Sequence, residues 1–179
     1  MTTTVSTLSM PAFVPPCLAQ PQEAPPEGDR WLHELKLDGF RVQVLKDGRT
    51  VRLLSRRGHN LAPRFPELAL AMLALPFRRV LLDGELVAHG PDGKPDFAAL
   101  MRTASRDDAN LVYWAFDLLH CNGRDTRQLP LEQRKHRLTE ALAGTALPCL
   151  ILSEPSRTAV RSSGRRDARS IEVTAPPRP

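Results

Sequence analysis

The segment 33–41 carries the side chains best suited to chemistry: a lysine, an aspartate-glycine pair and an arginine in the pattern K-x-D-G-x-R. We expect an apolar strand to end at Lys36, a tight turn at Asp38-Gly39, and a second strand to start near Arg41. This arrangement aims an amine and a guanidinium into one pocket, and the planar fork of Arg41 suits a phosphate because it donates two hydrogen bonds at once. The same pattern also fits a surface hairpin with solvated charges, and spacing alone does not separate the two interpretations.

Lysine is scarce in this sequence. Of the 25 basic residues, four are lysines (Lys36, Lys46, Lys94 and Lys135) and the others are arginines. Arginine stays protonated, whereas a lysine can lose its proton in suitable surroundings and act as an amine nucleophile. A sequence with this preference keeps lysine mainly where chance or chemistry requires it.

The elements that must position these side chains follow from apolar periodicity and turn residues. Asp47-Gly48 is a strong hairpin signal, Asp96 is a candidate helix cap, and Pro76 lies just past the end of a helical pattern. Strands are expected at 40–45, 50–54, 79–88, 111–119 and 147–153, and helices at 64–74, from Asp96 to about 103, and at 131–143. The third helix is amphipathic, with Leu131, Leu138 and Leu142 on one face. The sequence therefore predicts an α+β fold with mainly antiparallel sheets and flanking helices.

Composition divides the chain into three parts. Residues 1–30 contain six prolines and predict an extended lead-in. Residues 31–154 form the expected compact domain. Residues 155–179 are rich in Arg, Ser and Pro and predict a disordered tail. Six arginines and two acidic residues in that tail account for most of the net charge of +5. The tail either holds phosphate backbones without sequence preference or is simply a solvated end.

Overall composition excludes several classes of protein. The hydrophobic share of 41% and the charged share of 25% are ordinary for a globular chain. No apolar run approaches the ~20 residues of a membrane-spanning helix, and the N-terminus shows no secretory signal. The three cysteines form no zinc or disulfide pattern. These observations predict a cytoplasmic protein without a membrane partner.

The motifs along residues 11–154 resemble the covalent nucleotidyltransferase superfamily of ATP-dependent DNA ligases, RNA ligases and mRNA capping enzymes. K-x-D-G-x-R is similar to motif I, and three further segments in the right order resemble the next motif, motif III and motif IIIa: Ser55–Gly58, Leu82–Val87 and Tyr113–Leu119. The surrounding text is similar to bacterial ATP-dependent DNA ligases of the ligase D type. The resemblance implies an adenylation domain, ATP-grasp-like in fold class and incomplete at its C-terminus.

The resemblance also implies roles for individual residues, with ATP and Mg²⁺ as cofactors. Lys36 would attack the α-phosphate of ATP and become a lysine–AMP phosphoramidate, while Arg41 and Arg56 would hold ribose or phosphate oxygens. Phe116 would stack on the adenine, and Glu34 would lie beside the purine, where main-chain groups read its edge. Glu85 would contact the ribose or help seat the metal. Considered alone, Phe116 also fits core packing and Glu85 a solvated strand end.

The sequence departs from the complete family pattern. No Glu-Gly pair of motif IV and no paired lysines of motif V follow the segments above, and no lysine follows Lys135. Because such lysines would stabilise charge on the α-phosphate, we expect turnover to be impaired. The change in composition after Glu154 suggests a truncated or frame-shifted ligase.

Three functions are consistent with these features. The first is the adenylation half of an ATP-dependent DNA ligase that joins nicked or broken double-stranded DNA, with other end-joining or repair proteins as partners. The second is a non-catalytic ATP- or DNA-binding remnant of such a ligase. The third is an inert remnant that folds poorly.

Overall fold

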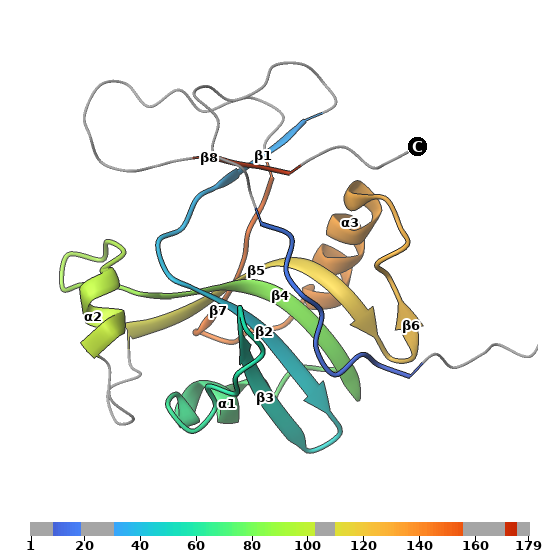
Figure 1. Ribbon diagram of the computed structural model, residues 1–179, viewed down its shortest axis with the longest axis horizontal. Helices are drawn as coiled ribbons and strands as arrows, with labels where there is room; N and C mark the ends of the chain where they lie inside the picture. Colours follow the sequence, from blue (N-terminus) through green and yellow to red (C-terminus); the bar gives the residue numbers. More distant parts are fainter. Residues whose placement is uncertain (1–8, 19–30, 103–109, 156–170, 175–179) are drawn as a thin grey trace, which may run out of the picture.

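A computed structural model describes residues 9–18, 31–102, 110–155 and 171–174 of the chain. Figure 1 shows one twisted sheet at the centre, with helices around it and a small strand pair above. The elements are β1 Leu32–Leu35, β2 Phe40–Asp47, β3 Thr50–Ser55, α1 Pro66–Met72, β4 Arg79–Ala88, α2 Phe97–Arg102, β5 Leu111–Cys121, β6 Arg124–Asp125, α3 Leu131–Leu142, β7 Leu150–Leu152 and β8 Ile171–Thr174. The predicted α+β class is confirmed.

The strands form two sheets. The larger is six-stranded in the order β3-β2-β4-β5-β6, with β7 paired to β5. All its pairs are antiparallel except the parallel β5–β7 pair. The smaller sheet consists of β1 and β8. The strand that precedes Lys36 therefore belongs to a different sheet from the strand that contains Arg41, so the predicted turn at Asp38-Gly39 does not join two paired strands.

The hairpin between β2 and β3 is confirmed and lies where the Asp47-Gly48 pair predicts it. Gly48 has φ +58°, in the left-handed region that glycine enters without steric cost. The Thr50 hydroxyl donates to the Asp47 carbonyl at 2.8 Å and closes the turn. This turn fixes the register between the two strands, and with it the level at which Arg41 stands in the sheet.

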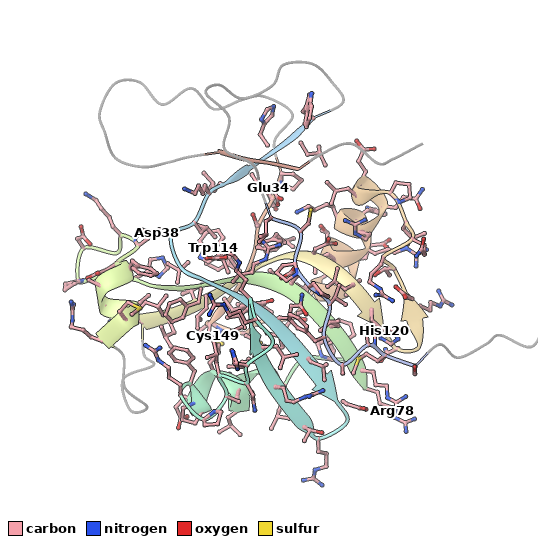
Figure 2. The ribbon with its side chains drawn as sticks, viewed as in Figure 1. Glu34, Asp38, Arg78, Trp114, His120 and Cys149 are labelled. Atoms are coloured by element: carbon pink, nitrogen blue, oxygen red, sulfur yellow. The ribbon has the colours of Figure 1, made fainter. Side chains whose placement is uncertain are left out.

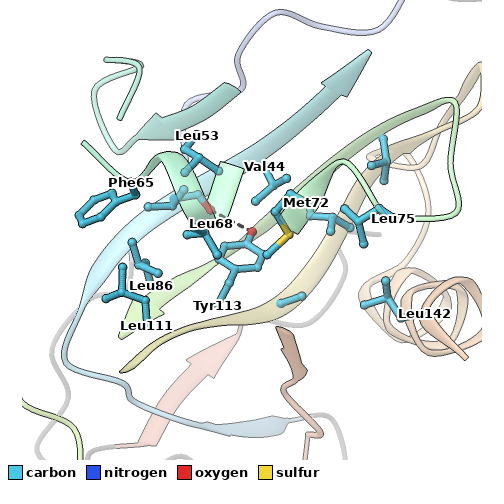
Figure 3. Close-up of a cluster of buried hydrophobic side chains, with 14 of the residues drawn as sticks. Val44, Leu53, Phe65, Leu68, Met72, Leu75, Leu86, Leu111, Tyr113 and Leu142 are labelled. Carbon is cyan, nitrogen blue, oxygen red and sulfur yellow. Dashed lines mark hydrogen bonds between the residues drawn. The ribbon is translucent and has the colours of Figure 1, made fainter. Parts of the chain in front are cut away.

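One face of the large sheet forms the main hydrophobic core. Figure 3 shows Tyr113 in the middle of this cluster, where its hydroxyl donates to the Val42 carbonyl at 3.0 Å. The ring passes directly over Gly84, because a Cβ there would stand 2.5 Å from the Tyr113 ring and 2.5 Å from the Trp114 carbonyl. Helix α1 covers this face through the buried side chains of Leu68 and Met72. The glycine of the Asp83-Gly84 pair is thus a packing requirement of the core.

The opposite face of the sheet is covered in part by residues 9–18, which contain no helix or strand. Phe13 and Val14 pack on a second cluster formed by Leu45, Leu54, Leu81 and Leu119. The Gln43 side chain accepts from the Val14 amide at 3.2 Å and donates to its carbonyl at 2.6 Å. The described part of the proline-rich segment is therefore docked on the sheet, and residues 1–8 and 19–30 lie outside the described residues.

Several element boundaries differ from the sequence prediction. Helix α1 begins at Pro66, which fits the first turn because it lacks an amide hydrogen, and β7 is shorter than the predicted strand at 147–153. The cap at Asp96 is confirmed, since its carboxylate accepts from the Ala99 amide at 2.8 Å. Strand β8 lies in the segment for which the sequence predicts disorder, so that prediction is wrong for Ile171–Thr174. The rest of the segment after residue 155 lies outside the described residues.

Candidate functional site

Arg41 lies near the start of β2, on the sheet face that residues 9–18 cover only in part. Residues directly opposite in an antiparallel pair share a face, and the register sets Arg41 opposite Glu85 on β4, which in turn stands opposite Trp114 on β5. The Arg41 guanidinium donates to both oxygens of Asp83, at 2.9 and 3.1 Å. This bidentate pair fixes the plane of the guanidinium on the open part of the face.

Phe116 lies on the same sheet face as Trp114, two residues earlier, and it stands at a bulge in β5. Asp83 pairs with Asp117 and Gly84 pairs with Ala115, so Phe116 is an extra residue on its strand. A bulge bends the strand locally. The Phe116 ring lies beside Arg41, whose guanidinium carbon is 4.3 Å from the ring centroid. An aromatic face and a cation are thus brought together at the position where the resemblance expects adenine and phosphate contacts.

Two aspartates next to Arg41 and Phe116, Asp83 and Asp117, are each paired with an arginine. Burial raises the pKa of Asp83 above its usual value, the Arg41 guanidinium opposes that rise, and the charge of Asp117 adds to it. Asp117 is itself held by Arg134 of α3 through contacts of 2.9–3.2 Å. The alternating charges orient both guanidinium groups without leaving a buried carboxylate unpaired.

Lys135 is the residue of this site that the sequence analysis missed. Its ammonium donates to the Glu34 carboxylate and, at 2.5 Å, to the Phe116 carbonyl. Both charged side chains are 7% exposed. The signal was present in the sequence, since Lys135 lies on the same helical stripe as Leu131, Leu138 and Leu142, all of which are buried. A lysine inside an apolar stripe indicates a buried partner for its charge.

Lys36 follows directly after β1 and its side chain is exposed. Within the described residues it makes no side-chain hydrogen bond or ion pair, so its amine is sterically accessible to a ligand. Gly39 explains the spacing of the motif, because a Cβ there would stand 2.2 Å from the Leu86 carbonyl oxygen. The chain can enter β2 this close to β4 only with glycine at that position, and no left-handed backbone is involved.

Arg56 lies at the rim. It occupies the turn after β3, where the Gly58 amide donates to the Ser55 carbonyl at 2.8 Å. Ser55 stands opposite Val42, so this turn is at the same end of the sheet as Arg41. The Arg56 side chain is exposed and contacts no other predicted site residue through a hydrogen bond within the described residues. The structure therefore gathers Glu34, Arg41, Glu85 and Phe116, and leaves Lys36 and Arg56 at the edges.

The described residues contain no group of three or more His, Cys, Asp or Glu side chains that could hold a metal by themselves. Two carboxylates, Asp83 and Glu85, lie on the site face, and Asp83 forms an ion pair with Arg41. Mg²⁺ usually keeps several waters and takes one or two protein carboxylates together with substrate phosphates. Glu85 with a bound triphosphate therefore fits Mg²⁺. Within the described part of the chain, no helix has the length and apolar character needed to cross a membrane.

Comparison with known proteins gives concordant matches. A family model described as "ATP dependent DNA ligase domain" matches residues 16–171, which extends beyond residue 154, where the motif resemblance ends. The multifunctional non-homologous end joining protein LigD of Pseudomonas aeruginosa is 42% identical over 136 residues, covering 75% of this chain and 16% of that protein. The SPbeta prophage-derived DNA ligase-like protein LigB of Bacillus subtilis is 35% identical over 125 residues, covering 69% of this chain and 45% of that protein.

Solved structures agree with the sequence matches. The ligase domain of M. tuberculosis LigD superposes with a TM-score of 0.59 at 33% identity, covering 70% of this chain and 40% of that one. A mycobacterial DNA ligase D complexed with ATP and MES superposes with a TM-score of 0.55, also at 33% identity and with the same coverage. The chain spans less than half the length of each of these relatives.

Proposed function

Because this chain belongs to the ATP-dependent DNA ligase domain family, we propose that it binds ATP on the open sheet face and transfers AMP to Lys36. The observation that carries the proposal is the gathering of Arg41, Glu85 and the bulged Phe116 on one face. Adenine would stack on Phe116, and Arg41 would turn from that ring toward ribose or phosphate oxygens. Arg56 at the rim would reach the phosphates, and Glu34 would lie beside the purine.

The transfer is an in-line displacement at the α-phosphorus. The Lys36 Nζ forms a bond to phosphorus, the bond from the α-phosphorus to the bridging oxygen breaks, and pyrophosphate leaves while the amine loses a proton. Such a reaction requires mainly positioning and charge stabilisation from the protein. Mg²⁺, held by Glu85 and phosphate oxygens, would neutralise charge on the phosphates. Arg41, which pairs with Asp83 in this structure, would supply positive charge to the phosphates once it turns toward them.

We propose the sealing reaction for the complete ligase rather than for this chain alone. In that reaction AMP passes to the 5′-phosphate of nicked or broken double-stranded DNA, and a 3′-hydroxyl then displaces it. Solved relatives contain a large part that this chain does not match, and the chain has no lysine after Lys135. End-joining or repair proteins are candidate partners. Three unpaired cysteines support a reducing, cytoplasmic location.

Adenylate transfer is tested with α-labelled ATP and Mg²⁺, followed by mass spectrometry of the protein. We expect an AMP adduct on Lys36 of the wild-type chain and none on Lys36→Ala. Lys94→Ala is the matched control, because Lys94 is also exposed and pairs weakly with Asp92 in a turn. Absence of label on the wild type, even with the C-terminal part of a related ligase supplied in trans, would contradict adenylate transfer.

The alternative function is nucleotide binding without transfer. It is favoured by the exposure of the Lys36 side chain, which no described residue holds in place. A chain that retains ATP in equilibrium dialysis but never acquires label would identify this function. A chain that neither binds ATP nor acquires label would be an inert remnant.

A further inference from the structure

Lys135 connects two elements that no backbone ladder joins. Its ammonium donates to the Glu34 carboxylate on β1 and to the Phe116 carbonyl on β5. Strand β1 is in the two-stranded sheet and β5 is in the six-stranded sheet. A single buried amine, 7% exposed, thus holds the strand that leads into Lys36 against the bulge that presents Phe116.

Both elements that Lys135 links, β1 and the bulge of β5, belong to different sheets and depend on side-chain contacts to hold them together. Among the described strands, β1 is hydrogen-bonded to β8 alone, so its position against the larger sheet depends on the short link at 36–39 and on side-chain contacts. At the other end, Phe116 is the residue that the β4–β5 register leaves unpaired. A bulged residue has no ladder partner for its own carbonyl. Lys135 satisfies that carbonyl and thereby fixes the conformation of the bulge.

We propose that Lys135 is the positioning residue of the adenine site, holding Glu34 and Phe116 in a fixed arrangement so that a base stacked on the Phe116 ring meets the Glu34 side chain at its edge. The inference rests on the proposed function, because it assumes that the base stacks on Phe116. In that position the purine edge faces the Glu34 region of β1. A carboxylate accepts a hydrogen bond from the exocyclic amine of adenine, and a purine without that amine offers it no donor. Lys135 would therefore control both affinity for ATP and discrimination against a triphosphate that lacks the amine.

The test measures equilibrium binding of ATP and of purine riboside triphosphate, which lacks the exocyclic amine. Binding is measured in EDTA so that no adenylate transfer occurs. The variant is Lys135→Met, which keeps the length of the side chain and removes its charge and donors. The matched control is Lys46→Met, because Lys46 is the other buried lysine and donates to the Leu73 and Leu75 carbonyls, away from the site face.

We expect the wild type and Lys46→Met to prefer ATP over purine riboside triphosphate by roughly five- to tenfold, which corresponds to about one hydrogen bond. Lys135→Met should lose most of this preference and bind ATP about tenfold more weakly. Lys135→Arg, which keeps the charge, should recover part of the preference. A merely structural role predicts lower stability with an unchanged ratio between the two nucleotides.

Each outcome bears on the inference. An unchanged ratio in Lys135→Met would overturn it. Where Lys135→Met does not fold, Lys135→Gln is measured instead. If neither variant folds while Lys46→Met does, Lys135 has a structural role only and the inference is overturned. A wild type that binds neither nucleotide contradicts the proposed function itself, whereas a wild type that binds ATP beside a normal Lys135→Met contradicts the inference alone.

Discussion

Gly84 offers the sharpest test of how the motif residues act, because its role is set by space rather than by chemistry. An alanine Cβ at this position would stand 2.5 Å from the Trp114 carbonyl oxygen, 2.5 Å from Cζ of Tyr113 and 2.6 Å from its hydroxyl. Tyr113 is fully buried and cannot rotate away without leaving its hydrogen bond to the Val42 carbonyl. Gly84→Ala must therefore displace either a central strand or a core aromatic residue.

The expected cost follows from these two displacements. Overpacking a close-packed core costs about 1–3 kcal/mol, and loss of the Tyr113 hydrogen bond adds about 1 kcal/mol. We expect Gly84→Ala to lower the free energy of unfolding by about 2–4 kcal/mol. For a chain of this size, each kcal/mol corresponds to a fall in Tm of about 2–4 °C. The measurement is urea denaturation followed by far-UV circular dichroism.

The matched control is Gly48→Ala. Gly48 also lies outside any helix but has no atom within 4 Å of an added Cβ, and its φ of +58° makes the strain purely conformational. That substitution should cost about 1 kcal/mol. If Gly84→Ala has a free energy of unfolding equal to or higher than that of Gly48→Ala, the predicted steric clash is refuted. It would mean that the strands β4 and β5 separate without penalty.

Two further predictions concern charged groups away from the site. Lys46→Met should lower the free energy of unfolding by about 2–4 kcal/mol in urea denaturation, since it removes two charge-assisted hydrogen bonds, at 2.6 and 2.5 Å, to the carbonyls of Leu73 and Leu75 just after α1; a loss below about 0.5 kcal/mol would contradict this. The hydrogen bond from Arg127 lowers the pKa of Asp125, so the pair stabilises the fold above the ordinary Asp pKa and this contribution is lost as pH falls through the lowered value. The difference in stability between wild type and Asp125→Asn should therefore be constant near neutral pH, at up to about 1 kcal/mol, and shrink in acid; a difference that grows in acid would reverse the assigned sign.

The sequence predicted the large sheet well because its strands carry strong local signals. The strand at Arg79–Ala88 has the predicted bounds, and the Asp47-Gly48 turn fixes its hairpin. What it could not predict was pairing between distant segments. A period of two shows that Leu32–Leu35 is extended but does not identify its partner, which is β8 at the far end of the chain. The Ile-Glu-Val-Thr run of β8 has β-branched alternation, but the Arg-rich composition around it suggested disorder.

The candidate site was predictable to a similar extent. The motifs identified Arg41, Glu85 and Phe116, and the sheet register brings all three onto one face. The bulge that leaves Phe116 unpaired gives no signal in the sequence, because one extra residue in a strand preserves its composition. Lys135 was overlooked because motif reasoning searches short segments. Its partner Glu34 lies 101 residues earlier in the sequence, although the two side chains are in contact.

The four lysines now separate by what their surroundings allow. Lys46 and Lys135 are buried and donate to fixed oxygens, so neither amine can attack a substrate without breaking the packing around it. Lys94 is exposed in a turn beside Asp92 and lies outside the site motifs. Lys36 alone combines an accessible amine with a place at the end of the strand that Glu34 and Lys135 hold against the sheet. Burial excludes Lys46 and Lys135, and position in the chain then separates Lys36 from the exposed Lys94 as the candidate nucleophile.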